Sequence, residues 1–140
     1  MLDRETTAPG LRLELFVSDC SRSAAFYINA LGFEVIRHDE SGYVSLRRGG
    51  AVIGLNAVER LAADHPLRPA PGDRIGLGVE IVLMVDDVAT AHAGAASISS
   101  PSPITLQPWG LTDFRVRDPD GYYIRVTGLS AHEVEPDLLP

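Results

Sequence analysis

Four charged residues interrupt stretches of sequence that are otherwise apolar and β-branched: Arg12, Glu14, Glu80 and Arg125. A charge in a strand that faces a protein interior is costly unless an opposite charge or a ligand pairs with it. The two arginines and the two glutamates can therefore pair with one another as a structural ion network. They can also orient a polar ligand, and the two roles are compatible.

The same residues bear on the chemistry that the chain can support. A buried glutamate can act as a general base, which makes Glu14 and Glu80 candidates for that role. A guanidinium is always protonated and has no lone pair, so Arg12 and Arg125 cannot bind a metal ion. Histidine is the commonest metal ligand, but the four histidines are expected at a strand end, on a linker, on a helix and in the tail: His38, His65, His92 and His132. The single cysteine, Cys20, cannot form an internal disulfide.

The elements that position these residues recur in the same order in two halves of the chain. Each half reads as a strand, a helix and three further strands, with glycine-containing turns between the last strands. Two such βαβββ modules predict an α+β fold. The expected parts are a flexible N-terminus, a first module, a linker with three prolines, a second module and a tail: residues 1–10, 11–56, 57–78, 79–128 and 129–140.

Helix signals flank the segment 18–32 in the first module. Ser18 or Asp19 can cap the start of the helix, and Gly32 can end it in the left-handed conformation. Aromatic residues that fall in amphipathic patterns are expected in the core: Phe26, Tyr27, Phe33 and Phe114.

Alternation along the strands separates a core face from an open face. The open face of the first module carries Arg12, Glu14, Phe16 and Asn56, and Tyr43 lies at a strand start. In the second module the open face carries the set Glu80, Val82, Met84, Tyr123 and Arg125.

Trp109, the only tryptophan, lies at an expected strand end before Gly110. An aromatic ring at the mouth of a cleft can stack on a planar ligand or a cation, although Trp109 can also cap a core. With the open-face residues and Tyr43, Trp109 completes the candidate ligand-binding set.

Composition excludes several classes of partner. The chain has 140 residues and a formal net charge of −7, which argues against nucleic acid because phosphates demand a basic face. No apolar run approaches the ~20 residues that a membrane span needs, and the N-terminus is polar rather than a secretory signal. We therefore expect a cytoplasmic protein that binds neither nucleic acid nor membranes.

Two stretches of the chain resemble a known family: "LELFVSD…SAAFYINALGFEV" and "VDDV…PWG…F…RDPDGYYIRV". Together they are similar to the vicinal oxygen chelate superfamily, which includes glyoxalases, bleomycin-resistance proteins and extradiol dioxygenases. The resemblance covers about residues 11–128. It implies that the sheets of the two modules curl into an incomplete barrel around a cleft, with the helices outside, and that the protein is a homodimer.

Enzymes of this superfamily hold a divalent metal with four side chains, from the first and last strand of each module. The resemblance places these four positions at Arg12, Gly54, Glu80 and Arg125. One carboxylate, two guanidiniums and a glycine do not provide the donors that a metal needs. We therefore expect no metal and no other cofactor.

The resemblance is closer to the bleomycin-resistance branch, whose members bind a drug without chemistry and place a tryptophan near the drug cleft. Ile36 stands where an aromatic residue of that branch is expected, which argues for a ligand other than bleomycin. We expect a metal-free protein that sequesters a planar or bulky toxic natural product, as in antibiotic resistance or self-protection. The alternative is a lyase, isomerase or dioxygenase that uses an incomplete or partner-supplied metal site, or Glu80 or Glu14 as a base.

Overall fold

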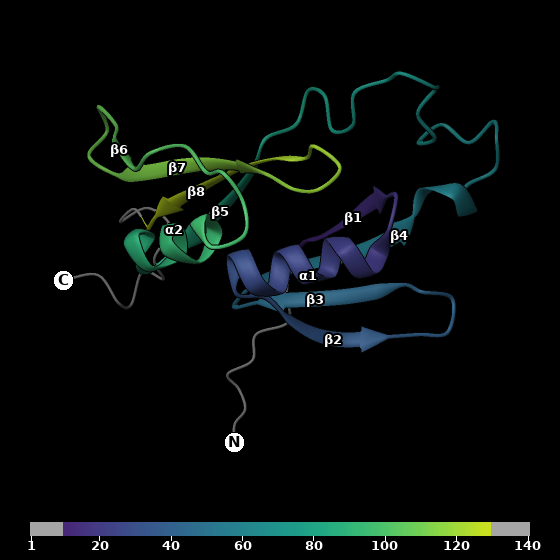
Figure 1. Cartoon of the computed structure of the whole chain (residues 1–140), viewed down its shortest axis with the longest axis horizontal. Helices are drawn as coiled ribbons and strands as arrows, with labels where there is room; N and C mark the ends of the chain where they lie inside the picture. The colour runs from purple at the N-terminus through teal and green to yellow at the C-terminus, as the bar shows by residue number, and fades with distance from the viewer. Residues whose placement is uncertain (1–9, 130–140) are drawn as a thin grey trace. The chain divides into compact units, whose positions relative to one another are not determined.

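The computed structural model describes residues 10–129, and the chain divides into two compact units between Arg74 and Ile75. Figure 1 shows the elements of both units in chain order. Each unit contains one four-stranded sheet and one α-helix, which confirms the predicted α+β fold with two βαβββ modules.

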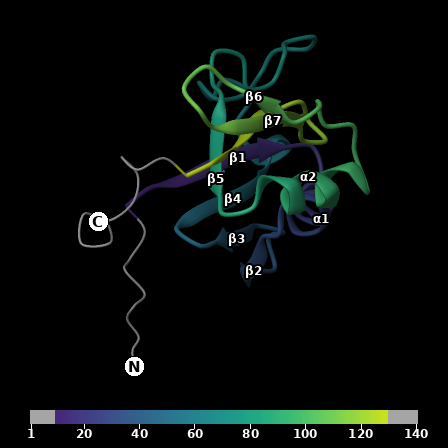
Figure 2. The same ribbon diagram turned by 90° about the vertical axis from the view of Figure 1, so that its left-hand side faces the viewer.

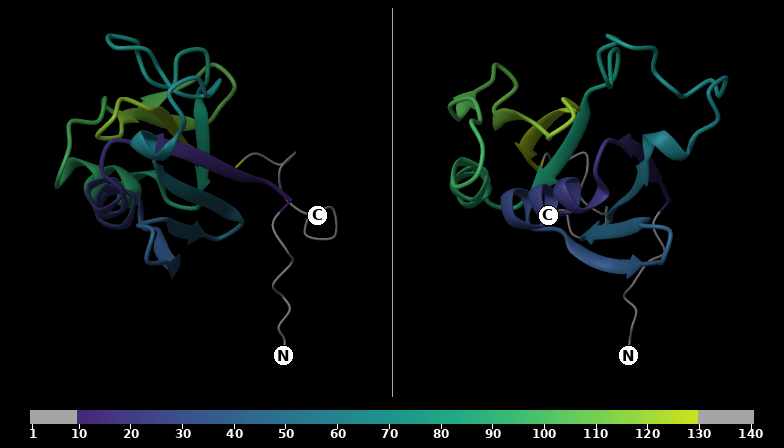
Figure 3. Two further views of the ribbon diagram at one scale, coloured as in Figure 1. Left: turned by 90° about the vertical axis from the view of Figure 1, so that its right-hand side faces the viewer. Right: turned by 45° about the vertical axis from the view of Figure 1, so that its right-hand side comes forward.

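The first unit consists of one sheet with a helix on one side. In chain order its elements are β1 (Arg12–Val17), α1 (Cys20–Leu31), β2 (Glu34–His38), β3 (Val44–Arg48), β4 (Ala51–Ala57) and the 3-10 helix η1 (Val58–Arg60). The strands are arranged β1-β4-β3-β2, with β1 parallel to β4 and the other pairs antiparallel. The right-hand view of Figure 3 shows α1 lying along the sheet of this unit.

Local signals at both ends fix the position of α1. The side chain of Asp19 accepts a hydrogen bond from the backbone N–H of Arg22 at 3.1 Å, which caps the N-terminus. Gly32 ends the helix with φ of 77°, a left-handed conformation that glycine adopts without strain. The predicted apolar face is buried, including Phe26 and Tyr27, whose rings meet edge to face at 5.2 Å.

The second unit repeats this topology. Its elements are β5 (Ile81–Val85), α2 (Val88–Ala96), β6 (Thr105–Leu106), β7 (Thr112–Arg117) and β8 (Tyr123–Gly128), arranged β5-β8-β7-β6 (Figure 2). β5 and β8 are parallel, while β7 is antiparallel to both β8 and β6. Phe114, Ile124 and Val126 are buried on the helix side of this sheet, in agreement with the expected core position of Phe114.

The turn from β7 to β8 explains the sequence "DPDG". Asp118 accepts hydrogen bonds on its side-chain oxygen from the backbone N–H groups of Asp120 and Tyr122, both at 2.9 Å. Gly121 has φ of 100°, which a residue with a side chain rarely adopts. This tight turn sets the register in which Arg115 lies opposite Arg125.

Two strands are shorter than the sequence predicts. The apolar run 79–85 reads as the first strand of the second module, but β5 begins only at Ile81, after a turn in which Gly76 and Gly78 both have positive φ. The strand expected over 104–109 is limited to Thr105–Leu106, because Pro108 has no N–H to donate and a turn follows at once.

The segment between η1 and β5 forms the long teal loop of Figure 3 and contains no helix or strand. Arg68 holds the start of this loop by donating to the backbone oxygens of Val58, Glu59 and Leu61. The expectation of a flexible N-terminus and a loose tail falls almost wholly outside the described residues. Within them, no helix has the length and apolar character needed to cross a membrane.

Candidate functional site

The open face of the first unit carries the charged residues that alternation placed there. Leu15 and Val17 of β1 are buried toward α1, whereas Glu14 lies on the opposite face. Arg12 Nε lies 2.6 Å from Glu14 Oε2, so two of the four charges expected to form an ion network pair within one strand. Because Arg12 is largely exposed, this pair contributes at most about 1 kcal/mol.

Neighbouring strands add two further partners for Glu14. The hydroxyl of Tyr43 donates to Glu14 Oε2 at 3.1 Å, and Asn56 Nδ2 donates to Glu14 Oε1 at 2.8 Å. Residues predicted from three separate segments therefore meet at one carboxylate. Burial and the adjacent charge of Glu14 raise the pKa of Tyr43 above its ordinary value of 10.0, so Tyr43 keeps its proton and acts as a donor at neutral pH.

Gly54 makes this arrangement possible. It pairs with Glu14 across β1 and β4, and a Cβ added at Gly54 would lie 2.5 Å from Glu14 Oε1 and closer still to the Tyr43 hydroxyl. Real Cβ atoms do not approach other atoms so closely. The Glu14 carboxylate and the Tyr43 hydroxyl therefore occupy the space that a side chain at position 54 would fill.

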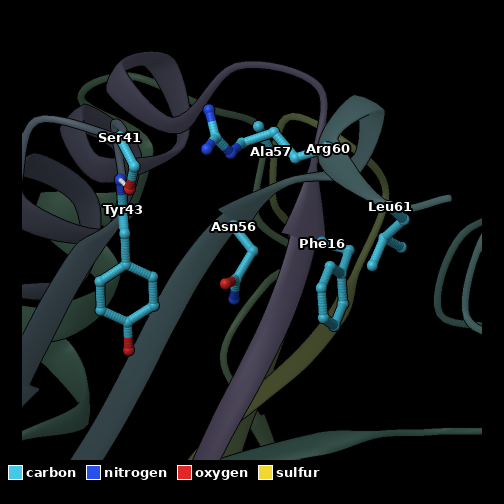
Figure 4. Close-up of a pocket in the computed structure, with 7 residues that line it drawn as sticks. All are labelled: Phe16, Ser41, Tyr43, Asn56, Ala57, Arg60 and Leu61. Carbon is cyan, nitrogen blue, oxygen red and sulfur yellow. Dashed lines mark hydrogen bonds between the residues drawn. The ribbon is translucent and has the colours of Figure 1, made fainter.

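A pocket of about 120 Å³ opens beside this cluster. Figure 4 shows Phe16, Asn56 and Tyr43 presented side by side from their elements, with Leu61 near Phe16. The lining combines apolar surface with a few hydrogen-bonding groups, as small-molecule sites do. Its members are Phe16, Ser41, Tyr43, Asn56, Ala57, Arg60 and Leu61.

Only three of the lining residues belong to the predicted set, namely Phe16, Tyr43 and Asn56. Sequence reasoning missed Ser41, Ala57, Arg60 and Leu61, which lie in a turn, at the end of β4, in η1 and just after it. Residues outside strands carry no alternation signal. Ala57, Arg60 and Leu61 fall within residues 57–78, the expected linker, where the sequence predicts no site residue.

The open face of the second unit carries the other two charges of the expected network, and they form an ion pair of their own. Arg125 Nε donates to Glu80 Oε1 at 3.2 Å. Val82 and Met84 lie on the same face of the sheet and are exposed. Tyr123 is half-buried, with the guanidinium of Arg117 at 5.7 Å from its ring centre.

A buried carboxylate that sequence reasoning missed lies on this face. Asp113 is 0 % exposed, and its Oδ1 accepts hydrogen bonds from Gln107 Nε2 at 2.8 Å and Arg115 Nη1 at 2.9 Å. Its Oδ2 has no hydrogen-bond partner and lies 3.7 Å from Arg125 Nη1. Asp113 alternates with the buried Phe114 and Val116 along β7 and so lies on the open face, yet it is itself fully buried.

Trp109 lies in the turn between β6 and β7 and is 59 % exposed. With this exposure, Trp109 does not cap a core formed by the described residues of the second unit. Its exposed indole is accessible for stacking, as the ligand-binding interpretation requires.

The four positions that enzymes of the resembled family use for metal do not fit a metal ion in this chain. The Gly54 position is occupied by the Tyr43 hydroxyl and the Glu14 carboxylate, and Glu80 is paired with the guanidinium of Arg125. The described residues contain no group of three or more His, Cys, Asp or Glu side chains that could hold a metal ion. We therefore derive no reaction step through a metal.

Comparison with known proteins finds a family to which this two-module chain is similar. The sequence profile of the Glyoxalase/Bleomycin resistance protein/Dioxygenase superfamily matches residues 11–126. No curated protein sequence matches the chain.

Solved structures share the fold at low sequence identity. TnmS3, an antibiotic binding protein from Streptomyces sp. CB03234, is 20% identical with a TM-score of 0.66, over 89% of this chain and 98% of that one. TioX from Micromonospora sp. ML1 is 20% identical with a TM-score of 0.64, over 86% and 96%. A lactoylglutathione lyase from Agrobacterium tumefaciens is 19% identical with a TM-score of 0.64, over 88% and 95%.

These neighbours include a binding protein and an enzyme, so the fold alone does not choose between the two functions. The profile match spans most of the chain and agrees with the two βαβββ modules described above. The chain belongs to the Glyoxalase/Bleomycin resistance protein/Dioxygenase superfamily.

Proposed function

We propose that this protein binds a small, planar or bulky natural product without a metal and sequesters it. The observation that carries the proposal is the chemistry at the four metal positions of the family. A glycine whose space is filled and a glutamate paired with an arginine replace the donors of a metal centre. Sequestration needs only shape and polar complementarity, which the pocket beside Tyr43 supplies.

The pocket can hold only part of a natural product. Its volume of about 120 Å³ is below the ~300 Å³ at which drug-sized sites begin. The second unit offers aromatic surface of its own at Tyr123 and the exposed Trp109, and we assign these two residues stacking contacts with planar compounds. The antibiotic binding protein of the same fold supports a ligand of this class.

Enzymatic activity is the alternative, with Glu14 or Glu80 as a metal-free base. Both carboxylates are already paired with guanidiniums, and Glu14 also accepts hydrogen bonds from Tyr43 and Asn56. A base must be free to accept a proton from its substrate. We therefore favour binding over catalysis, although the lyase of the same fold makes the comparison worth testing.

The decisive experiment combines metal analysis with ligand recovery. Protein purified without chelators is analysed for metals and is then titrated with coumarin, a neutral planar probe, and with a panel of planar natural products. We expect no stoichiometric metal, quenching of Trp109 fluorescence, and recovery of every bound compound unchanged by mass spectrometry. A compound that is chemically converted by the protein, or a metal required for binding, would contradict the proposal.

Variants localise the binding. Phe16→Ala and Asn56→Ala alter the pocket, so both should weaken the binding of compounds that bind there. Leu67→Ala is the matched control, because Leu67 is an exposed apolar residue of the loop that does not line the pocket. Equal losses in all three variants would show that binding does not use the pocket.

We further propose that the protein forms a homodimer. β1 and β5 each pair with a single strand in the described residues, so each leaves one sheet edge without a partner there. Exposed strand edges favour pairing with another chain or element. Sedimentation velocity across a range of protein concentrations tests this, and a monomer throughout would overturn it.

A further inference from the structure

The arginines on the open face of the second unit have more hydrogen-bond donors than their contacts with the described residues use. Each guanidinium carries five N–H groups. Arg115 donates to Asp113, and Arg125 donates to Glu80. Their side chains remain 31% and 22% exposed, so unused N–H groups can be reached from solvent.

The buried carboxylate below them holds these guanidiniums in place. Asp113 is fixed by Gln107 and by Arg115, and its second oxygen lies 3.7 Å from Arg125. Since Arg115 and Arg125 are paired residues on adjacent strands, the two side chains rise from neighbouring points of one sheet. A buried polar anchor under two partly exposed guanidiniums is a preorganised anion site rather than a set of solvated surface charges.

The charge balance of the face selects the anion. Three guanidiniums, of Arg115, Arg117 and Arg125, stand against the carboxylates of Asp113 and Glu80. One positive charge is left over, and this balance still holds when Glu80 gives up its contact with Arg125, because its carboxylate stays tethered to the same unit; a single carboxylate of a ligand balances the remaining charge. A doubly charged phosphate would leave an excess of negative charge in a protein whose formal net charge is already −7.

Glu80 shows how such a carboxylate would be held. It is the more exposed member of its pair with Arg125, at 37% against 22%. The Glu80 carboxylate, on a partly exposed side chain, already lies against the guanidinium, so a carboxylate of a ligand can take its place. Asp113, being buried, cannot leave its position in the same way.

We propose that Arg115 and Arg125 bind a carboxylate group of the ligand, with Asp113 as the buried anchor and Glu80 as the protein group that the ligand displaces. This inference rests on the proposed function, because it names a chemical group carried by the sequestered compound. It predicts that planar aromatic carboxylates bind better than their neutral counterparts.

The test uses sodium benzoate as the probe, with neutral benzamide as its isostere. The full-length protein, labelled with ¹⁵N-arginine, is titrated at constant ionic strength while the side-chain Nε–H signals are followed. We expect benzoate to shift the signals of Arg115 and Arg125 in a saturable manner, and benzamide to shift neither. Equal shifts with both compounds would overturn the carboxylate site.

Two variants should change the affinity for benzoate in opposite directions, and a third should leave it unchanged. Arg115→Gln should weaken benzoate binding roughly tenfold, since one charge-assisted donor pair is lost. Glu80→Gln should strengthen it severalfold, because the competing carboxylate and its repulsion are removed. Arg37→Gln, an equal change of charge on β2 of the first unit, should leave binding unchanged.

The gain expected for Glu80→Gln cannot result from misfolding, so it keeps the test valid if Arg115→Gln is unstable. A loss of benzoate binding in Glu80→Gln would refute the displacement of Glu80. Equal weakening by Arg37→Gln and Arg115→Gln would show a general charge effect instead of a site. Tight inorganic phosphate binding would overturn the preference for a single negative charge.

The experiments distinguish a failure of the proposed carboxylate site from a failure of the proposed sequestration. Coumarin carries no carboxylate, so its binding tests the proposed function without the arginines. If coumarin binds and benzoate does not, sequestration stands and the carboxylate site falls.

Discussion

Replacing Asp113 with alanine should destabilise the second unit strongly, although no ligand is involved. The carboxylate is 0 % exposed and its Oδ1 accepts two hydrogen bonds, from Gln107 at 2.8 Å and Arg115 at 2.9 Å. Its removal leaves Gln107 without this acceptor and removes a negative charge from beside Arg115 and Arg125.

The size of the effect follows from burial. Removing one partner of a fully buried ion pair costs about 3–5 kcal/mol. Here the arginines are partly exposed and water can solvate them in the variant, so we expect a loss of about 2–4 kcal/mol in the free energy of unfolding. Asp113→Asn keeps the shape and one acceptor oxygen but loses the charge, so it should cost roughly half as much.

Urea unfolding followed by Trp109 fluorescence measures this change. Trp109 lies in the second unit, close in sequence to Gln107 and Asp113, whereas far-ultraviolet circular dichroism reports on both units. Two units need not unfold together, so both signals should be recorded. Asp64→Ala makes the same charge change at an exposed loop position and should leave the midpoint unchanged. An Asp113→Ala midpoint equal to that of Asp64→Ala would refute the structural role of the buried carboxylate.

Further predictions concern the first unit. Gly54→Ala should displace Glu14 and break its hydrogen bond with Tyr43, because the new Cβ would overlap both groups. The pKa of Tyr43, which burial and the charge of Glu14 both raise, should then fall in a spectrophotometric titration, and an unchanged titration would contradict this. The raised pKa also makes stability fall as pH rises above about 10, since the unfolded chain loses the Tyr43 proton first; Glu14→Gln should reduce this fall, and an identical pH profile would argue against the coupling. Asp19→Ala should cost about 1 kcal/mol by removing the cap of α1, measured as a lower urea midpoint, whereas an unchanged midpoint would show that the cap is dispensable.

The fold could be predicted because its signals are local. The alternation in β1, the cap at Asp19 and the left-handed Gly32 each depend on a few neighbouring residues, and the structure confirms them. Strand ends were less predictable, as β6 shows, because Pro108 and the following turn limit pairing that the apolar pattern alone would allow.

The buried carboxylate could not be predicted because its environment is not local. In "TDFRVRD" the charged residues alternate with Phe114 and Val116, a pattern typical of a strand with one solvated face. Asp113 departs from that pattern because it contacts Gln107 at the end of β6, Arg115 on its own strand and Arg125 on β8. Once the strand register is known, Asp113 and Arg115 fall opposite Thr127 and Arg125, and the cluster becomes visible.

Arg125 stands at a position that bears both on metal binding and on the binding of an anionic ligand. The resemblance to the family implied that a guanidinium stands where its enzymes carry a metal ligand, and so it argued against a metal. The structure shows that this guanidinium lies between an exposed carboxylate of Glu80 and a buried one of Asp113. In our proposal, the buried Asp113 holds the Arg125 guanidinium in place, and the guanidinium can exchange the Glu80 carboxylate for that of a ligand. The same substitution that argues against metal chemistry thus provides a donor for an anionic ligand, and this is why we assign the second unit a role in choosing what the protein binds.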